Sequence, residues 1–180
     1  MLLVVDNGSI YTKQLTDFLS EKNISFEKYT PYILELNSLQ KYDSIILSGR
    51  RKNDKKINEV NSKIINFSIK NKKKLLGICY GAEILALTLG GTIRKTQSIQ
   101  KGNEIIEILK DDLITKNSIN VFESHAFEIS KLPNILTIIG KSNNCKYEII
   151  QHKEKLIFGP QFHPEMTPDG NNLIENFCSL

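Results

Sequence analysis

A cysteine between two glycines, in residues 77–81, constrains the fold of this chain more than any other feature. The stretch reads Gly-Ile-Cys-Tyr-Gly and directly follows the apolar pair Leu75-Leu76. Side chains two residues from a strained turn would collide, so glycine on both sides predicts a nucleophile elbow, where a strand turns tightly into a helix. Backbone N–H groups after Cys79 are then expected to hold an anion and lower the thiol pKa. A buried structural cysteine is the alternative.

A second element lies near the C-terminus, where residues 158–165 read Phe-Gly-Pro-Gln-Phe-His-Pro-Glu. A cysteine nucleophile needs a base, and the base needs a third group to fix its tautomer. His163 and Glu165 can supply both, because residues i and i+2 of an extended segment project to the same side. Pro164 restricts His163 to extended conformations. The pair is far from Cys79 in sequence, so the fold must bring them together.

The apolar pattern predicts an α/β fold in one domain over residues 1–180. Its first half alternates strands with helices, and its second half has strands separated by short turns before a final helix. We therefore expect a mostly parallel central sheet flanked by helices, with an antiparallel extension in the C-terminal half. Strands are predicted at residues 2–6, 25–30, 44–48, 75–78, 103–110, 118–122, 136–141, 147–152 and 156–159, and helices at 11–21, 57–70, 82–89 and 171–178.

These motifs together resemble the class I glutamine amidotransferases, the glutaminases with a Cys-His-Glu triad. Gly-Ile-Cys-Tyr-Gly and Gln-Phe-His-Pro-Glu carry the resemblance, which covers nearly the whole chain. Residues 4–12, 45–49 and 123–125 (Glu-Ser-His) resemble the branch that serves GMP synthetase, above all the archaeal type, in which the glutaminase is a separate polypeptide. The glutaminases of anthranilate and aminodeoxychorismate synthases share the Cys and His-x-Glu elements and rank second.

The resemblance implies hydrolysis of glutamine through a thioester on Cys79. His163 would take the thiol proton and return it to the departing ammonia, while Glu165 orients the imidazole. Backbone N–H groups at Tyr80 and near Gly49 would hold the oxyanion. The resemblance also assigns Glu83 and Gly102 to substrate binding. No cofactor or metal is expected.

The chain departs from the family pattern at two positions. Ser48-Gly49-Arg50-Arg51 stands where Ser-Gly-Gly-Pro is usual, and Glu83 stands where a glutamine usually contacts the substrate. An ionised carboxylate accepts hydrogen bonds but cannot donate them, and it would repel the substrate carboxylate. Arg50 could offset that charge. Alternatively, both side chains point to solvent without consequence.

The partner of this chain is expected to be a separate ATP-dependent synthetase subunit that receives the ammonia. The sequence has no Gly-x-x-x-x-Gly-Lys-Ser/Thr phosphate loop, so the amination chemistry should lie in another polypeptide. A non-catalytic homologue that keeps the fold and binds a partner is a third hypothesis. The basic stretches at residues 50–56 and 70–74 lack interleaved aromatics, which favours solvated loops over a nucleic-acid surface.

The cysteine count points to a reducing compartment. Cys79, Cys145 and Cys178 are odd in number and widely spaced, which argues against disulfides and against a zinc site. The latter two are expected to pack as small hydrophobes. His125, at a predicted strand end, and His152, in a predicted charged turn, are weaker base candidates than His163. With no visible leader and no apolar run long enough for a bilayer, a cytoplasmic protein without membrane contact is expected.

Overall fold

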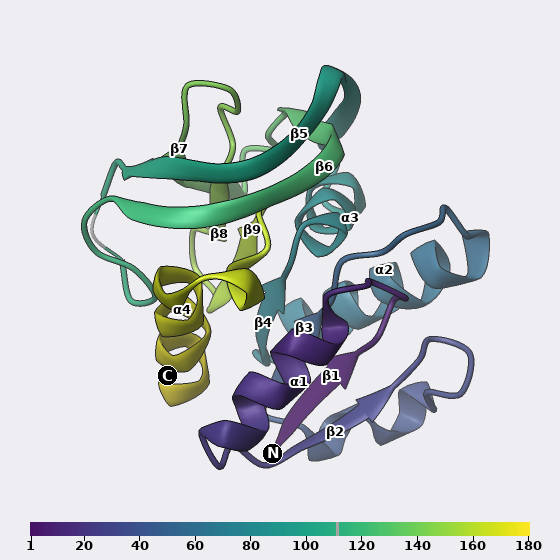
Figure 1. Ribbon diagram of the computed structural model, residues 1–180. Helices are drawn as coiled ribbons and strands as arrows, with labels where there is room; N and C mark the ends of the chain where they lie inside the picture. Colours follow the sequence, from purple (N-terminus) through teal and green to yellow (C-terminus); the bar gives the residue numbers. More distant parts are fainter. Residues whose placement is uncertain (111) are drawn as a thin grey trace.

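The computed structural model describes residues 1–110 and 112–180, which form a nine-stranded sheet with helices on both faces (Figure 1). The strand order is β2-β1-β3-β4-β9-β8-β7-β5-β6. The strands are β1 Leu2–Val5, β2 Phe26–Tyr29, β3 Ser44–Leu47, β4 Lys74–Gly77, β5 Thr92–Ile108, β6 Ile119–Lys131, β7 Leu136–Lys141, β8 Ile149–His152 and β9 Ile157–Pro160. The helices are α1 Thr12–Glu21, α2 Lys55–Lys70, α3 Tyr80–Thr88 and α4 Pro168–Ser179, with 3-10 turns at η1 Leu36–Lys41 and η2 Pro164–Met166.

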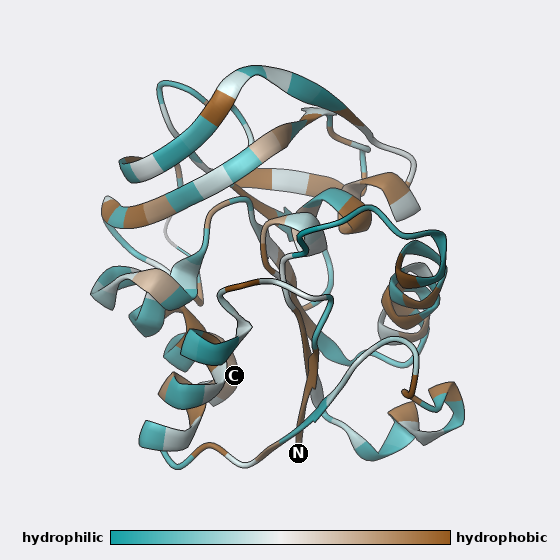
Figure 2. Cartoon of the chain, turned by 45° about the vertical axis from the view of Figure 1, so that its right-hand side comes forward, coloured by the Kyte–Doolittle hydropathy of each residue, from teal (hydrophilic) through white to brown (hydrophobic). Residues whose placement is uncertain are grey.

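The inner parallel strands β1 and β3 are buried on both faces. Along β1, Leu3 and Val5 pack in the cluster that includes α2 and α3, while Leu2 and Val4 pack in the cluster that includes α1 and α4. A strand covered on both sides reads as a continuous apolar run, because alternate side chains enter opposite cores. Figure 2 shows these central strands as hydrophobic and the outer faces of the helices as largely hydrophilic. The predicted parallel core is confirmed.

The antiparallel extension is also confirmed, with one change in its composition. β9 comes from the second half of the chain yet pairs in parallel with β4, through Leu75 with Ile157 and Leu76 with Phe158. The antiparallel strands begin beyond it, at β8, and continue through β7 and β5 to β6. As a result, the segment after β9 leaves the sheet at the same edge as the segment after β4.

The predicted strands at residues 103–110 and 118–122 were too short. β5 begins at Thr92, and β6 runs on to Lys131, so the two form a long two-stranded arm that overhangs the sheet (Figure 1). Residues 92–102 are mostly exposed and polar, so they lack the apolar alternation that marks a half-buried strand.

Three predicted helices begin earlier than expected. α2 starts at Lys55 because Asp54 caps it, accepting a hydrogen bond from the Ile57 N–H at 3.0 Å. α4 starts at Pro168, after Thr167 accepts from the Gly170 N–H at 3.2 Å. α3 starts at Tyr80, directly after the elbow cysteine. Side-chain caps that precede the first apolar residue set the starts of α2 and α4, whereas α3 has no side-chain cap.

Across the described ranges, no helix has the length and apolar character needed to cross a membrane. Cys79, Cys145 and Cys178 are all free thiols. Cys145 is buried, and Cys178 is half-buried against the cluster that includes α1 and α4. The residues that the structure describes contain no group of three or more His, Cys, Asp and Glu side chains arranged to hold a metal.

Candidate active site

The turn at Cys79 has the strained backbone that the sequence predicts. Cys79 has φ 51° and ψ −103°, a conformation that residues with a Cβ seldom adopt. A Cβ on Gly77 would lie 2.5 Å from the carbonyl oxygen of Gly81, and one on Gly81 would lie 2.7 Å from that of Leu47. Both flanking residues must therefore be glycine for α3 to start this close to β4. The elbow is confirmed.

The cysteine and the His-Pro-Glu segment follow neighbouring strands at one edge of the sheet. Cys79 lies two residues after the end of β4, and its N–H donates to the carbonyl of Pro160, the last residue of β9, at 2.8 Å. His163 comes three residues later and forms an isolated bridge to β6, where its N–H donates to the Phe122 carbonyl at 2.9 Å. The carboxyl ends of parallel strands are where α/β sheets place their sites.

The imidazole of His163 is fixed on several sides. Its Nδ1 lies 2.9 Å from Glu165 Oε1, and both side chains are buried. The Tyr11 ring packs edge-on at 4.5 Å between centroids, and a Cβ on Gly49 would lie 2.9 Å from His163 Cε1. The predicted contact with Glu165 is present, but the predicted extended segment is not, because Pro164 begins the turn η2. With Nδ1 engaged, Nε2 is the nitrogen left to exchange protons.

A cavity of about 210 Å³ opens beside Cys79. It is lined by residues from the loop after β3, from the start of α3 and from β6: Arg50, Arg51, Lys52, Asn53, Cys79, Tyr80, Glu83, Ser124, His125, Ala126 and Phe127. Gly102 is not among the lining residues and lies opposite Glu123 in the β5–β6 arm. Of the predicted site positions, Cys79, Tyr80 and Glu83 line the cavity, whereas Gly49, His163, Glu165 and Gly102 are not among its lining residues.

Glu83 faces inward rather than toward solvent. Its side chain is buried, and Oε1 accepts a hydrogen bond from Gln161 Nε2 at 3.3 Å. Burial raises the pKa of Glu83, although the Gln161 hydrogen bond and the charges of Arg50 and His125 partly oppose the rise. No local pattern in the sequence marks Gln161 as the partner of Glu83.

The electrostatics at Cys79 are opposite to the sequence expectation. Burial, followed by the negative charges of Glu83, Glu123 and Glu165, raises the thiol pKa well above its ordinary value. The Tyr80 N–H lowers it, as a helix N-terminus should, but this effect is the smaller one. The three carboxyls come from α3, β6 and η2, so only the folded chain brings them to the thiol. Cys79 is therefore a neutral thiol that needs a base before it can attack.

Arg50 contacts Tyr80 and Asn58 rather than Glu83, whose charge the sequence suggested it could offset. Its guanidinium carbon lies 3.8 Å from the centroid of the Tyr80 ring, and Nη1 donates to Asn58 Oδ1 at 2.5 Å. Among the described residues no salt bridge joins Arg50 to Glu83. Arg50 still lowers the Glu83 pKa by its charge, so partial compensation persists without direct contact.

The other two histidines occupy different positions from those predicted. His125 lies inside β6 rather than at a strand end, buried, with Nδ1 2.8 Å from the Phe127 carbonyl and Nε2 3.0 Å from Glu123 Oε2. Burial would lower the pKa of His125, but Glu123 and the Phe127 carbonyl raise it. His152 is the last residue of β8 and is buried, rather than in a charged turn.

Behind His125, two buried carboxyls share one environment. Ser142 Oγ donates to Glu148 Oε1 at 2.7 Å and Glu123 Oε2 lies 3.0 Å from His125 Nε2, while Glu148 Oε2 and Glu123 Oε1 lack a donor. A proton between the two carboxyls would supply one. In agreement, burial and then the charge of Glu123 raise the pKa of Glu148 above the ordinary 4.5.

We expect Glu148→Gln to make the fold more stable at pH 8 and less sensitive to pH. The pKa of Glu148 is higher in the folded chain than in the unfolded chain. The stability that protonated Glu148 contributes is therefore fully present below about pH 4.5 and is lost as pH rises through its pKa in the folded chain. In the wild type, this group should make the free energy of unfolding fall by up to about 1.4 kcal/mol per pH unit. Urea unfolding between pH 5 and 9 measures it, with exposed Glu107→Gln as control. Equal slopes for wild type and Glu148→Gln would contradict the assignment.

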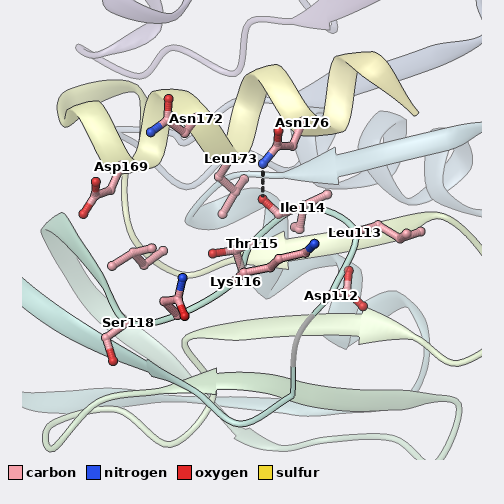
Figure 3. Close-up of a pocket in the computed structure, with 12 residues that line it drawn as sticks. Asp112, Leu113, Ile114, Thr115, Lys116, Ser118, Asp169, Asn172, Leu173 and Asn176 are labelled. Carbon is pink, nitrogen blue, oxygen red and sulfur yellow. Dashed lines mark hydrogen bonds between the residues drawn. The ribbon is translucent and has the colours of Figure 1, made fainter.

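A larger cavity, of about 500 Å³, lies away from Cys79, between the chain following β5 and helix α4 (Figure 3). Its wall is built from charged, amide, hydroxyl and aliphatic side chains, with Asn176 donating to the Ile114 carbonyl at 3.1 Å. The lining residues include neither a cysteine nor a histidine. Volume alone does not select a reaction site, and we place the candidate site at Cys79.

Comparisons with known proteins show the family to which this chain is similar. The family model for class I glutamine amidotransferases matches residues 3–179. The glutamine-hydrolyzing subunit of GMP synthase from Methanocaldococcus jannaschii is 30% identical over 100% of this chain and 97% of that protein. The longer GMP synthase of Thermosipho melanesiensis is 31% identical over 99% of this chain, which spans 35% of it. A crystal structure described as a GMP synthase subunit from Thermoplasma acidophilum has a TM-score of 0.88 at 27% identity, covering 99% of this chain and 92% of that one.

Proposed function

We propose that this chain, which belongs to the class I glutamine amidotransferases, is a single-domain glutaminase subunit that supplies ammonia for GMP synthesis. It would hydrolyse L-glutamine to glutamate and ammonia, and a separate ATP-dependent subunit would use the ammonia to aminate xanthosine monophosphate. One observation carries the proposal: the elbow cysteine and the bonded His163–Glu165 pair follow the neighbouring strands β4 and β9. Three free cysteines support a cytoplasmic location.

In the first step, His163 takes the proton of the Cys79 thiol as sulfur attacks the side-chain amide carbon of glutamine. The base is required because the thiol is neutral at rest. Glu165 accepts from Nδ1 and stabilises the imidazolium. The C–S bond forms while the amide oxygen becomes an oxyanion. Backbone N–H groups at Gly49 and Tyr80 would hold it, each contributing about 3–4 kcal/mol to the transition state.

In the second step, the oxyanion collapses and the C–N bond breaks. His163 gives its proton to the leaving nitrogen, so ammonia departs and a thioester remains on Cys79. Water then attacks the thioester carbon, with His163 again acting as base. The C–S bond breaks, glutamate leaves and the thiol regains its proton. All chemistry at this site is therefore hydrolytic, and the chain needs a partner to use the ammonia.

The acceptor is assigned from the relatives. Those of similar length are named as the glutamine-hydrolyzing subunit of GMP synthase, and this chain spans nearly all of each. A glutaminase for anthranilate or aminodeoxychorismate synthase shares the same chemistry and is the second candidate. A non-catalytic homologue is favoured only by the acidic surroundings of Cys79 and by Glu83 in place of the usual glutamine.

We expect the isolated chain to hydrolyse glutamine slowly and to be activated by its synthetase partner. The sequence has no phosphate loop for ATP, so the acceptor is expected on the partner and uncoupled turnover would waste glutamine. Adding the ATP pyrophosphatase subunit of an archaeal-type GMP synthetase, with ATP, Mg²⁺ and xanthosine monophosphate, should raise glutamate release about 5- to 150-fold. A glutamate dehydrogenase assay measures it.

Two controls sharpen this test. The partner without nucleotides separates docking from activation, and the Cys79→Ala chain removes hydrolysis by any other site. A chorismate-using synthase that co-purifies with the chain and activates it in place of the pyrophosphatase would select the second candidate. Full-speed hydrolysis by the isolated chain, unchanged by either partner, would count against a coupled subunit.

A further inference from the structure

Two side chains from separate segments meet on one asparagine oxygen beside the elbow. Asn58 Oδ1, on α2, accepts from Arg50 Nη1 at 2.5 Å and from the Tyr80 hydroxyl at 2.8 Å. The guanidinium of Arg50 also stacks on the Tyr80 ring, at 3.8 Å from its centroid. A planar cation can stack and donate at once, and both contacts restrict its orientation. We call Arg50, Asn58 and Tyr80 the clamp.

The clamp joins the two loops that would supply the oxyanion donors. Gly49 and Arg50 belong to the loop after β3, and Tyr80 follows the nucleophile after β4. As the first residue of α3, Tyr80 has no carbonyl within its helix to receive its N–H. The loop after β3 is held at one end by the Ser48 N–H bond to Val5 and at the other by the Asp54 cap. Between these ends, residues 51–53 are exposed.

We propose that Arg50 is a positioning residue for glutamine hydrolysis, because it fastens the loop after β3 to Tyr80 and so fixes the spacing of the two backbone N–H donors. This inference rests on the proposed function. It gives a physical reason for arginine where the family pattern has glycine. Backbone donors stabilise an oxyanion only when preorganised, and a shift of about 1 Å can cost about a hundredfold in rate.

The contacts also separate this role from a simple charge effect. One face of the Arg50 guanidinium is covered by the Tyr80 ring, and Nη1 is committed to Asn58. A residue that only neutralised Glu83 would need only its charge, and one that bound the substrate carboxylate would change KM rather than kcat. A stacking role instead needs the planar group, so lysine should not replace it.

The test uses the purified chain with glutamine and with a chloroketone analogue of glutamine, whose ketone oxygen must also enter the oxyanion site. In Arg50→Gln, kcat and the maximal inactivation rate should both fall about tenfold to a hundredfold, with KM and the analogue's half-saturating concentration changed less than about twofold. Iodoacetamide needs no oxyanion donor, so its rate with Cys79 should stay unchanged.

Arg50→Lys should behave like Arg50→Gln. Tyr80→Leu should lower the same rates, and the Arg50→Gln/Tyr80→Leu double variant should be no worse than either single.

Lys56→Gln is the matched control, since it removes an exposed positive charge from the first turn of α2 outside the cavity and the clamp. Rescue by Arg50→Lys, a rise in KM alone, additive losses in the double variant, or an equal loss of iodoacetamide reactivity would each overturn the inference. A wild-type chain that neither hydrolyses glutamine nor is inactivated by the chloroketone would instead refute the proposed function. An active wild type matched by Arg50→Gln would refute the clamp alone.

Discussion

Replacing Cys79 by alanine is expected to abolish glutamine hydrolysis while the chain still folds. Loss of the nucleophile should lower kcat by about a thousandfold or more, because no other thiol lies at the cavity wall among the residues that the structure describes. Purified Cys79→Ala should release no glutamate above the background in the glutamate dehydrogenase assay, with or without the partner.

The fold should tolerate this change because alanine keeps the geometry of the elbow. Cysteine and alanine both carry a Cβ, so the cost of φ 51° is the same in both proteins. Only a small buried sulfur is lost, which should change the free energy of unfolding by about 1 kcal/mol. The negative charges of Glu83, Glu123 and Glu165 disfavour a thiolate at Cys79. Alanine cannot ionise, so the substitution removes no favourable charge interaction.

Labelling identifies the nucleophile independently of the loss of activity. The chloroketone should alkylate Cys79, with chloride as the leaving group, and mass mapping should find Cys145 and Cys178 unmodified. Cys145→Ala is the matched control, since it removes another buried thiol whose pKa is also raised by burial. Label found mainly on Cys145 or Cys178, or full activity in Cys79→Ala, would reject Cys79 as the nucleophile.

The elbow could be predicted from sequence because part of its requirement is local. A Cβ added to Gly77 would lie 2.5 Å from the Gly81 carbonyl oxygen, inside the five-residue pattern, whereas one added to Gly81 would lie 2.7 Å from the Leu47 carbonyl oxygen, on the neighbouring strand. The parallel core was equally legible, because strands buried on both faces have to be apolar throughout. The pairing of His163 with Glu165 was also predictable, since they lie only two positions apart.

The charge state of Cys79 could not be predicted, because its causes are not local. A helix N-terminus is visible in the sequence, whereas Glu123 reaches the thiol only through the β5–β6 arm. That arm was itself underestimated, since exposed polar residues carry no periodicity to mark a strand. The contact of Arg50 with Tyr80 could not be predicted either, because it depends on how two loops that are distant in sequence meet in the fold.

Gly77→Ala is expected to be the most destabilising single methyl addition near the site. The new Cβ would lie 2.5 Å from the Gly81 carbonyl oxygen and 3.1 Å from the Ala82 nitrogen, so backbone rather than a side chain would have to move. Overpacking against rigid neighbours should lower the free energy of unfolding by about 3 kcal/mol. Any relief would push the start of α3 away from β4, so the Tyr80 N–H should also lose its place and hydrolysis should fall.

Gly140→Ala separates this backbone clash from the effect of any added methyl. Gly140 also has no positive φ, but its Cβ would meet only the side chains of Ile106 and Ile149, at 3.0 Å. Those side chains can shift by a few tenths of an ångström, so urea unfolding should show a loss of about 1 kcal/mol and unchanged hydrolysis. If Gly77→Ala proved as stable as Gly140→Ala and equally active, the close approach of α3 to β4 would not require glycine at position 77. The steric account of the elbow would then fail.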